Sequence, residues 1–332
     1  MSTDWTVVGD LHADNNNREK VEKLFDWLEE LGKNVIFMGD LFDTKEIIHG
    51  KIFNYIRHRL KISKLTFVID VGNHDWFNLD CLEHSLESLK DLPNVLVVDR
   101  PLIVDGLGIV MPYYQDLAKF RKDLDSISKN GVYTLFMHQG FAGFDYGNGH
   151  MADGLGHGEL EADDLKNLLQ RFRRIISGHF HKYAAEGNFM FIGTPFSQDF
   201  GETDQTKFIA SYNSETDELE LMETPFPRHR TLTMNLETAP SPEENLRGWL
   251  DQYPKDHWRL RLIGTEMQIA AFDKASFPAV KFLDEPTDAD QIENANIKDT
   301  DSNEQKFLIW AKEIKGLDEV TISEGLEILK AS

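Results

Sequence analysis

Carboxylate, imidazole and amide side chains recur in five short clusters, and each cluster follows an apolar run of the chain. The clusters are Gly9-Asp10-Leu11-His12, Gly39-Asp40-Leu41-Phe42-Asp43, Gly72-Asn73-His74-Asp75, His138-Gln139-Gly140 and Gly178-His179-Phe180-His181. Such ligands suit manganese, iron, zinc or magnesium better than a metal that prefers thiolate. They are too many for one tetrahedral zinc ion, but they fit two octahedral ions that share a carboxylate. Two ions about 3.5–4 Å apart stabilise in-line displacement at phosphorus, so the pattern predicts a two-metal phosphoesterase.

The position of each cluster after an apolar run has a structural explanation. In open α/β sheets, binding sites form beyond the carboxyl ends of the strands. A glycine beside the ligand lets the backbone turn sharply, so that the next side chain points into the crevice. In Asp10-Leu11-His12 and in His179-Phe180-His181, a gap of one residue places both ligands on the same side of an extended segment.

The first two-thirds of the chain alternates short apolar runs with amphipathic stretches, which predicts an α/β domain with helices over a mixed sheet. Buried strands are predicted at Trp5–Val8, Asn34–Met38, Leu65–Val71, Tyr133–Met137 and Arg174–Ser177, and helices at Arg18–Leu31, Lys45–Leu60, Leu117–Ser128 and Asp163–Leu169. Further short strands are predicted at Leu102–Val104, Gly108–Met111, Phe189–Ile192, Phe208–Tyr212 and Glu218–Glu223.

Two prolines interrupt this pattern near Thr224–Arg228, and a small α+β unit is predicted after them. It comprises strands at Arg230–Met234, Trp258–Ile263 and Ala279–Phe282, a helix that Ser241 caps, and a helix at Glu266–Asp273. Asp284–Asn303 is acidic and polar, which indicates a linker. Helical patterns return at Glu304–Ile314 and Ser323–Leu329. The predicted parts are therefore residues 1–226, 227–283, 284–303 and 304–332.

Taken singly, each cluster has a simpler explanation. A glycine followed by aspartate after a strand is commonly a turn, Asn73 could be a turn residue in the left-handed region, and His138 could be a core histidine. Turns alone do not produce this order of ligand types, so the five clusters together favour a metal site.

The clusters, in this order and spacing, resemble the motifs of the calcineurin-like metallophosphoesterases over roughly residues 5–225. The resemblance implies a four-layer α/β/β/α domain that holds two divalent ions. The implied ligands are Asp10, His12 and His181 for one ion, Asn73, His138 and His179 for the other, and Asp40 as the bridge.

Three neighbouring positions have expected roles of another kind. The resemblance implies that His74 binds no metal but stabilises developing charge at the phosphate or protonates the leaving oxygen. It implies that Asp75 orients His74 or its loop. Asp43 stands where some relatives have a substrate-orienting histidine, so its role is open. Thr44 and Asp75 replace the arginine and glutamate of Ser/Thr phosphoprotein phosphatases, which argues against that class.

Segments beyond the clusters resemble the nuclease subunit of the SbcC–SbcD type, including related phage recombination endonuclease subunits. They are Gly39–Thr44, Met111-Pro112-Tyr113, Ile192–Ser197 and Phe200-Gly201-Glu202, followed by the strand Phe208–Tyr212. This resemblance implies a DNA nuclease with manganese, or magnesium, as its metal. It implies exonuclease action on duplex ends and endonuclease action on single strands, in a complex for DNA repair or recombination.

The same resemblance gives the C-terminal parts expected roles. Residues 227–283 would form a capping domain that shapes access of DNA, and the terminal helices would bind an SMC-like ATPase of the SbcC type. The residues expected to bind this partner are Phe307, Leu308, Trp310, Ile314, Leu326 and Leu329. Packing of this apolar face on its own domain is the competing explanation. A homodimer through Ile47–Leu60 and Leu79–Leu89 is also implied, and the short chain favours a phage or compact bacterial source.

The composition sets outer limits on these functions. The chain has 332 residues, 41% of them hydrophobic, which suffices for a large domain and a smaller one. No run of about 18 apolar residues predicts a membrane span, and the N-terminus lacks the regions of a signal peptide. The single cysteine, Cys81, excludes an internal disulfide and fits a reducing, cytoplasmic setting. A net charge of -22 argues against a protein that coats nucleic acid by charge alone.

Two other functions stay open at this point. A small-molecule phosphodiesterase, for example for cyclic nucleotides, would be favoured by a deep closed pocket, whereas an open groove with a cap would favour DNA. A non-catalytic scaffold would keep the fold only to hold a partner, but the intact ligands and His74 argue against it.

Overall fold

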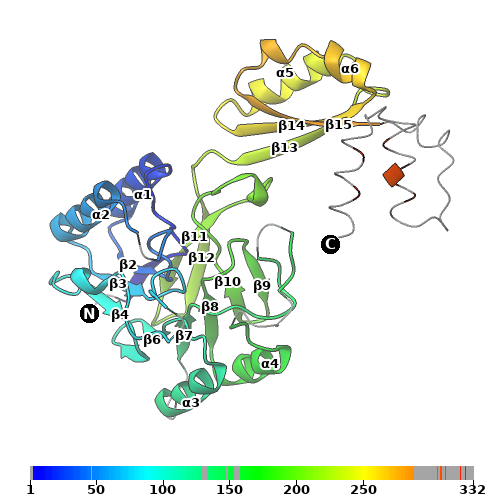
Figure 1. Cartoon of the computed structure of the whole chain (residues 1–332). Coiled ribbons are helices and arrows are strands. Elements are labelled where there is room, and N and C mark those ends of the chain that lie inside the picture. The colour runs from blue at the N-terminus through cyan, green and yellow to red at the C-terminus, as the bar shows by residue number, and fades with distance from the viewer. Residues whose placement is uncertain are drawn as a thin grey trace. The chain divides into compact units, whose positions relative to one another are not determined.

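The computed structural model in Figure 1 describes residues 3–287 apart from 46, 79, 129–132, 147–148 and 153–157. It also describes six residues of the C-terminal segment, which are Gln305, Phe307, Leu308, Ala311, Ile322 and Leu326. The chain divides into two compact units, the first ending at Arg230 and the second beginning at Thr231. Among the helices of the described part, none has the length and apolar character that a membrane crossing requires.

The first sheet has six strands in the order β12-β11-β1-β2-β3-β4. The strands are β1 (Asp4–Val8), β2 (Asn34–Phe37), β3 (Phe67–Asp70), β4 (Val95–Val98), β11 (Phe208–Asn213) and β12 (Glu218–Glu223). Strands β1 to β4 pair in parallel, whereas β11 pairs antiparallel with both β1 and β12. The central strands are apolar on both faces, as expected of parallel strands covered on both sides.

The second sheet also has six strands, in the order β5-β6-β7-β8-β10-β9. The strands are β5 (Leu102–Val104), β6 (Gly108–Met111), β7 (Thr134–Met137), β8 (Arg174–Ser177), β9 (Ala184–Glu186) and β10 (Phe189–Phe191). Strands β6, β7, β8 and β10 are parallel, and β5 and β9 are antiparallel edge strands.

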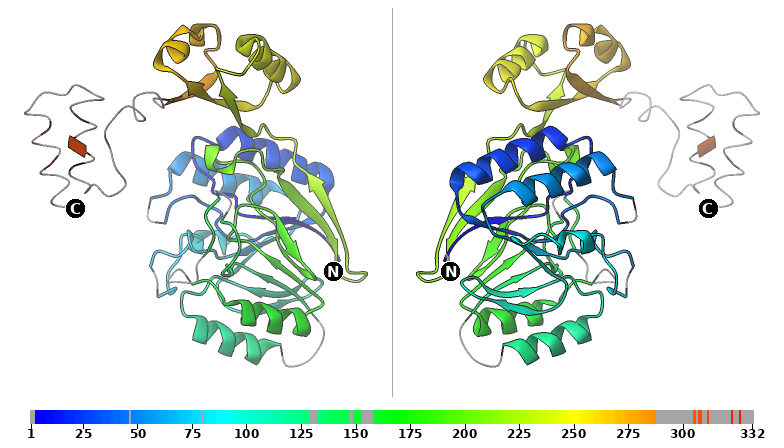
Figure 2. Two further views of the ribbon diagram at one scale, coloured as in Figure 1. Left: turned by 90° about the vertical axis from the view of Figure 1, so that its right-hand side faces the viewer. Right: turned by 90° about the vertical axis from the view of Figure 1, so that its left-hand side faces the viewer.

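The two sheets pack face to face, and helices cover both outer faces (Figure 2). The helices are α1 (Arg18–Leu31) and α2 (Gly50–Ile62) on the first sheet, and α3 (Leu117–Ile127) and α4 (Ala162–Arg171) on the second. Ile36 and Val68 of the first sheet pack with Phe136 and Ile176 of the second in a core between the sheets. This arrangement confirms the predicted four-layer α/β/β/α fold.

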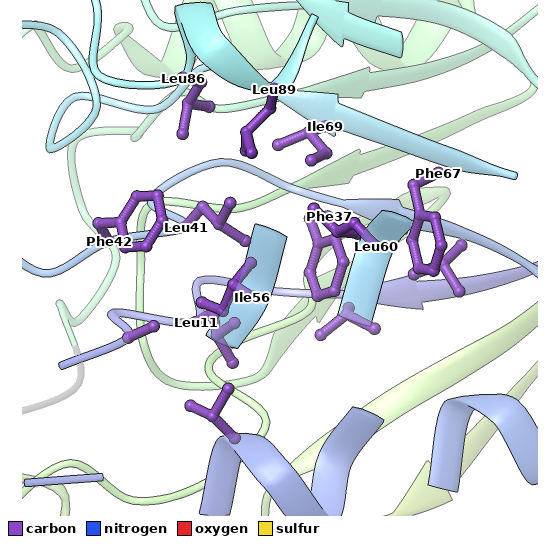
Figure 3. Close-up of a cluster of buried hydrophobic side chains, with 14 of the residues drawn as sticks. Leu11, Phe37, Leu41, Phe42, Ile56, Leu60, Phe67, Ile69, Leu86 and Leu89 are labelled. Carbon is purple, nitrogen blue, oxygen red and sulfur yellow. The ribbon is translucent and has the colours of Figure 1, made fainter. Parts of the chain in front are cut away.

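The cluster between the first sheet and its helices is shown in Figure 3. Helix α2 buries Ile56 and Leu60, one turn apart, against Phe37 and Phe67 of β2 and β3. The two phenyl rings stack with centroids 6.3 Å apart. Leu41, which follows Asp40, is buried in the same cluster, so the core fixes the loop that carries that carboxylate.

Several sequence predictions for this unit are wrong in detail. Helix α2 spans Gly50–Ile62 instead of the predicted Lys45–Leu60. His49 is extended, and Ile47 is 70% exposed, so no buried apolar contact of Ile47 stabilises a further helical turn. Strands β4 and β9 were not predicted. In the described part of 79–89, only the 3-10 turn η1 (Glu87–Leu89) is helical, so this proposed dimer segment is not a continuous helix, and the homodimer stays a prediction.

The second unit contains a three-stranded sheet in the order β13-β14-β15. Its elements are β13 (His229–Asn235), α5 (Pro242–Gln252), β14 (His257–Gly264), α6 (Glu266–Ala271), the 3-10 turn η3 (Lys274–Ser276) and β15 (Val280–Pro286). Leu246 of α5 and Ile269 of α6 pack on Leu260 and Leu262 of β14. The predicted α+β unit is therefore present.

The end of this unit differs from the prediction. Strand β15 pairs in parallel with β14 as far as Pro286, three residues into the predicted linker. The acidic residues there suit an edge strand, since Glu285 pairs with Arg261 at 2.9 Å and Asp284 pairs with Lys274 at 2.6 Å. The assignment of capping and partner-binding roles to the C-terminal parts stays a prediction.

The described residues of the C-terminal segment include three of those predicted to bind the ATPase. Phe307, Leu308 and Leu326 are in helical conformation and half-buried. Trp310, Ile314 and Leu329 lie outside the described residues.

Candidate metal centre

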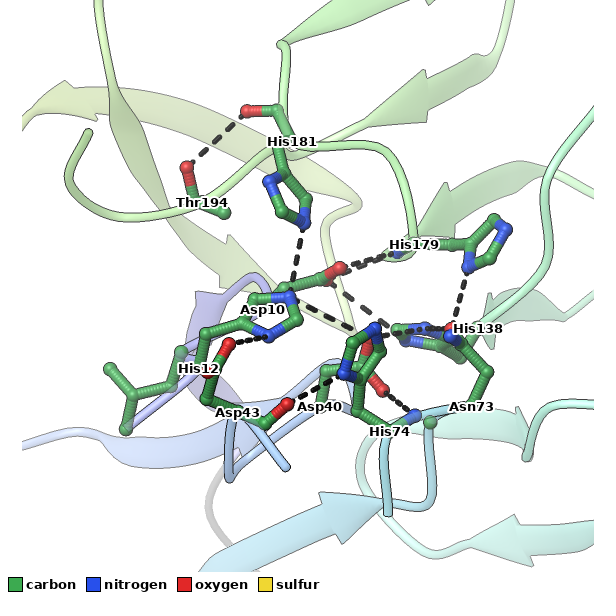
Figure 4. Close-up of polar contacts among 12 residues, drawn as sticks. Asp10, His12, Asp40, Asp43, Asn73, His74, His138, His179, His181 and Thr194 are labelled. Atoms are coloured by element: carbon green, nitrogen blue, oxygen red, sulfur yellow. Dashed lines mark hydrogen bonds and ion pairs between the residues drawn. The ribbon is translucent and has the colours of Figure 1, made fainter. Parts of the chain in front are cut away.

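Five loops at the carboxyl ends of strands from both sheets bring the predicted residues together (Figure 4). Asp10 and His12 follow β1, Asp40 and Asp43 follow β2, Asn73 to Asp75 follow β3, His138 follows β7, and His179 and His181 follow β8. Most of these residues line one cavity of about 430 Å³, whereas Asp10, Asp75 and His138 are completely buried and do not line it. The site is thus assembled from segments as far as 171 residues apart in the chain.

The backbone at this site is unusual. Three candidate ligands have positive φ angles although none is glycine: His12 at 45°, Asp40 at 48° and His179 at 82°. Such conformations cost about 1–3 kcal/mol each and persist only where the surrounding structure enforces them. They turn the chain sharply after each strand, so that the side chains point towards one another.

The first group of candidate ligands consists of Asp10, His12 and His181, whose ligand atoms lie within 4.8 Å of one another. Nε2 of His12 is 3.0 Å from Nε2 of His181. Two imidazole nitrogens at this distance need either a shared proton or a cation between them. Two nitrogen ligands at right angles on one ion, with bonds of about 2.1 Å, lie about 3.0 Å apart, so the pair fits a metal ion.

The second group lies around His138, which is completely buried. Its Nδ1 donates to the carbonyl oxygen of Met38 at 2.6 Å, so in the neutral ring Nε2 keeps its lone pair. That lone pair faces Oδ1 of Asn73 at 3.0 Å and Oδ2 of Asp40 at 3.3 Å. Nδ1 of His179 is 2.7 Å from the same Asn73 oxygen. When His179 carries its proton on Nε2, all of these atoms are acceptors, and a cation between them would satisfy their lone pairs.

Asp40 lies between the two groups. Its Oδ2 is 3.3 Å from Nε2 of His138 and 3.7 Å from Nε2 of His12, and its Oδ1 accepts from the backbone of His74 at 2.7 Å. This position suits a carboxylate shared by two ions.

The pKa values of two buried histidines, His138 and His12, indicate the same demand for positive charge. Burial lowers the pKa of His138, but the charges of Asp40 and Asp10 outweigh it and raise that pKa to about 10. Burial likewise lowers the pKa of His12, but its contact with Asp43 and the charge of Asp40 raise it to about 9. Protons thus take up the negative charge where no other cation is bound, so the residues fit divalent ions.

The residues beside the candidate ligands hold them in place. Asp75 is completely buried and accepts from the backbone of Leu41 at 3.2 Å and of Gly72 at 2.9 Å, so it joins two site loops instead of contacting the His74 ring. Nδ1 of His74 donates to the carbonyl oxygen of Asp43 at 2.7 Å. The Asp43 carboxylate lies 3.4 Å from Nδ1 of His12.

Four residues that line the cavity carried no predicted role: Tyr146, Gln198, Asp199 and Glu202. Glu202 belongs to the Phe200-Gly201-Glu202 segment, whose resemblance to the nuclease subunits implies no site role for it. Burial raises its pKa, but the hydrogen bond with His181 and the charge of Lys207 outweigh it and lower that pKa to about 2. No periodicity or spacing of the sequence links Glu202 to His181.

Replacing Gly72 by alanine is expected to damage both the site and the fold. A Cβ at this position would overlap the carboxylate and the backbone nitrogen of Asp40. We expect a loss of about 1–3 kcal/mol in the free energy of unfolding, together with a loss of metal-dependent hydrolysis. Chemical denaturation and a phosphodiesterase assay measure the two effects. The control is Gly50→Ala, since a Cβ at Gly50 meets nothing within 4 Å; equal behaviour of the two variants would contradict the prediction.

Comparison with known proteins defines the class that this fold and site belong to. Residues 5–183, more than half of the chain, match the model of the calcineurin-like phosphoesterases. The chain therefore belongs to the calcineurin-like phosphoesterase family, whose members use divalent metals.

Two individual proteins are similar to parts of this chain. Exonuclease subunit 1 of Enterobacteria phage T4 is 27% identical over 201 residues, which are 58% of this chain and 57% of that protein. The match thus spans little more than half the length of that relative. A solved structure described as an archaeal phosphodiesterase matches 66% of this chain and 99% of its own, with a TM-score of 0.35 and 14% identity.

Proposed function

We propose that the chain is a nuclease that hydrolyses phosphodiester bonds of DNA with two divalent ions, manganese or magnesium. The observation that carries the proposal is the convergence of lone pairs from both sheets, with Asp40 between the two groups. The similarity to an exonuclease subunit supports a nucleic-acid substrate and a role as one subunit of a complex. We further propose that its partner is an SbcC-type SMC-like ATPase.

The proposed ligands are those predicted from the sequence, with Asp10, His12 and His181 on one ion, Asn73, His138 and His179 on the other, and Asp40 on both. When bound, such ions supply Lewis acidity to the phosphoryl group and make water a stronger nucleophile. Asp75 keeps the loops of Leu41 and Gly72 together, which fixes Asp40 and Asn73 relative to each other.

His74 acts on the leaving group in this proposal. Because its Nδ1 donates to the Asp43 carbonyl, Nε2 is the nitrogen left for the substrate. As an imidazolium, the ring gives the proton on Nε2 to the leaving oxygen as the phosphorus–oxygen bond breaks, and its charge stabilises the phosphate while the bond breaks.

The net charge of -22 bears on how DNA is bound. Affinity for the phosphate backbone comes mainly from lysine and arginine that displace counterions. The subunit alone is therefore expected to bind duplex DNA weakly, with the ATPase supplying much of the affinity. Tight binding of the isolated subunit to duplex DNA at physiological salt would contradict this expectation.

The test is degradation of end-labelled linear duplex DNA by the purified chain with Mn²⁺, and again with an added SbcC-type ATPase. Bis-p-nitrophenyl phosphate serves as a small phosphodiester substrate. We expect cleavage of both substrates, abolished by a chelator and restored by Mn²⁺. If neither substrate is cleaved, the chain is not the proposed hydrolase.

A small-molecule phosphodiesterase is the second candidate, and the size of the cavity favours it. A cavity of about 430 Å³ falls within the range of small-ligand sites. Cleavage of the small ester and of cyclic nucleotides without any cleavage of DNA, even with the ATPase present, would select this alternative.

A further inference from the structure

A buried ion pair lies behind the ring of His181. Glu202 belongs to the 3-10 turn η2 (Phe200–Glu202), and Lys207 directly precedes β11. Oε1 of Glu202 is 2.7 Å from Nδ1 of His181, and Oε2 is 2.8 Å from Nζ of Lys207. The Glu202 and Lys207 side chains are only 4% and 3% exposed. A carboxylate and an ammonium are thus withdrawn from water beside a candidate metal ligand.

The surroundings of Glu202 determine which nitrogen of His181 carries the proton. Oε2 of Glu202 also accepts from the backbone of Gln198 at 3.1 Å and from the hydroxyl of Thr194 at 3.3 Å. With three donors on this oxygen, one of them a lysine, the carboxylate is ionised and can only accept. Nδ1 of His181 must therefore be the donor. In the neutral ring, Nε2 then keeps its lone pair and points at His12, 3.0 Å away.

Lys207 also fixes the main chain of the same ligand. Its Nζ donates to the carbonyl oxygen of His181 at 2.8 Å, beside the backbone N–H of Thr194 at 3.1 Å. One ammonium thus holds both the backbone of His181 and the carboxylate that orients its ring. Burying two charges is costly, and apolar residues of the same shape are often at least as stable. Fold stability alone is therefore a poor explanation for the pair.

We propose that Glu202 and Lys207 are positioning residues of the metal centre, Glu202 by fixing the orientation and tautomer of His181 and Lys207 by holding Glu202. The inference rests on the proposed two-metal centre. Partners of this kind orient a metal-binding histidine and increase its basicity, and their loss typically lowers metal affinity about 10–100-fold.

The experiment compares the wild type with Glu202→Gln and with the double variant Glu202→Gln/Lys207→Met in calorimetric titrations of the metal-free full chain with MnCl₂. The glutamine amide can donate to Nδ1 of His181, which moves the ring proton to Nε2. One of the two Mn²⁺ affinities is therefore expected to fall about 10–100-fold, while the other stays near the wild-type value. The double variant removes both buried charges, so it guards against unfolding caused by one unpaired charge.

The matched control is Lys33→Met. Lys33 is half-buried and its Nζ donates to the hydroxyl of Ser211 at 2.6 Å, away from Glu202 and the candidate ligands, so its loss is expected to leave both affinities unchanged. If the wild type binds two Mn²⁺ ions and the folded double variant binds them equally well, the inference is wrong. An equal loss at both sites would overturn it too, since that indicates general damage. A wild type that binds no Mn²⁺ would overturn the metal centre itself.

Discussion

Replacing His74 by serine is expected to slow phosphodiester cleavage by a factor of about 10²–10⁴, the usual contribution of a general acid. The structure holds the ring by a hydrogen bond of 2.7 Å from Nδ1 to the Asp43 carbonyl, which leaves Nε2 for the substrate. Serine has no group that can reach the same place as a proton donor. The rate is measured at saturating Mn²⁺, together with a calorimetric titration of Mn²⁺, which is expected to be unchanged.

The choice of substrate tests the assigned role of His74 more sharply. A p-nitrophenolate leaves without help from an acid, whereas a nucleoside alkoxide does not. The variant should therefore lose less activity on bis-p-nitrophenyl phosphate than on DNA. His58→Ser, an exposed histidine of α2, is the control and should behave as the wild type. His74 also lies within 4.8 Å of possible ligand atoms of His12 and Asp40, so loss of a bound ion in His74→Ser would instead make His74 a ligand.

The second large effect is expected for Asp40→Asn, which should abolish binding of both ions. Asp40 Oδ2 lies 3.7 Å from Nε2 of His12 and 3.3 Å from Nε2 of His138, one in each group of candidate ligands. Asparagine keeps the size of the side chain and removes its charge. Loss of both ions would remove at least several kcal/mol of transition-state stabilisation, so the rate is expected to fall by at least about 10³-fold, as with a chelator. Metal content after gel filtration and the rate of ester hydrolysis are the measurements.

The control for this variant is Asp163→Asn, which removes one carboxylate from an exposed position and should change neither quantity. Retention of one tightly bound ion by Asp40→Asn would mean that this carboxylate serves only one of the two sites, against the proposed bridge.

The sequence predicted the strands that carry the candidate ligands, because a short run apolar on both faces that ends at a glycine or directly at a polar ligand has few other structures. Phe37 and Met137 each end such a run, two residues before Gly39 and one before His138. The four-layer fold came from a family resemblance, since strand patterns alone do not reveal that two sheets stack.

Other features depend on tertiary contacts that leave no local pattern. Helix α2 begins later than predicted, and Ile47, although apolar, is exposed to solvent instead of packing on the core. Glu202 lies in a three-residue turn and approaches His181 only because the loop after β10 folds back over the site. Side-chain partners that are 21 residues apart and lie on irregular segments cannot be recognised from periodicity.

The candidate ligands come from both sheets, so the ribosome produces them at different times. Residues that follow β1, β2 and β3 emerge early, whereas His179 and His181 emerge only after more than half of the chain. Lys207 and β11, which pairs with the first strand β1, are made later still. The proposed ion-binding site therefore stays incomplete in a nascent chain until residues of both sheets have been made. Ions that bind only the fully folded protein would stabilise it against unfolding. Above the dissociation constant, this stabilisation increases with the logarithm of the ion concentration.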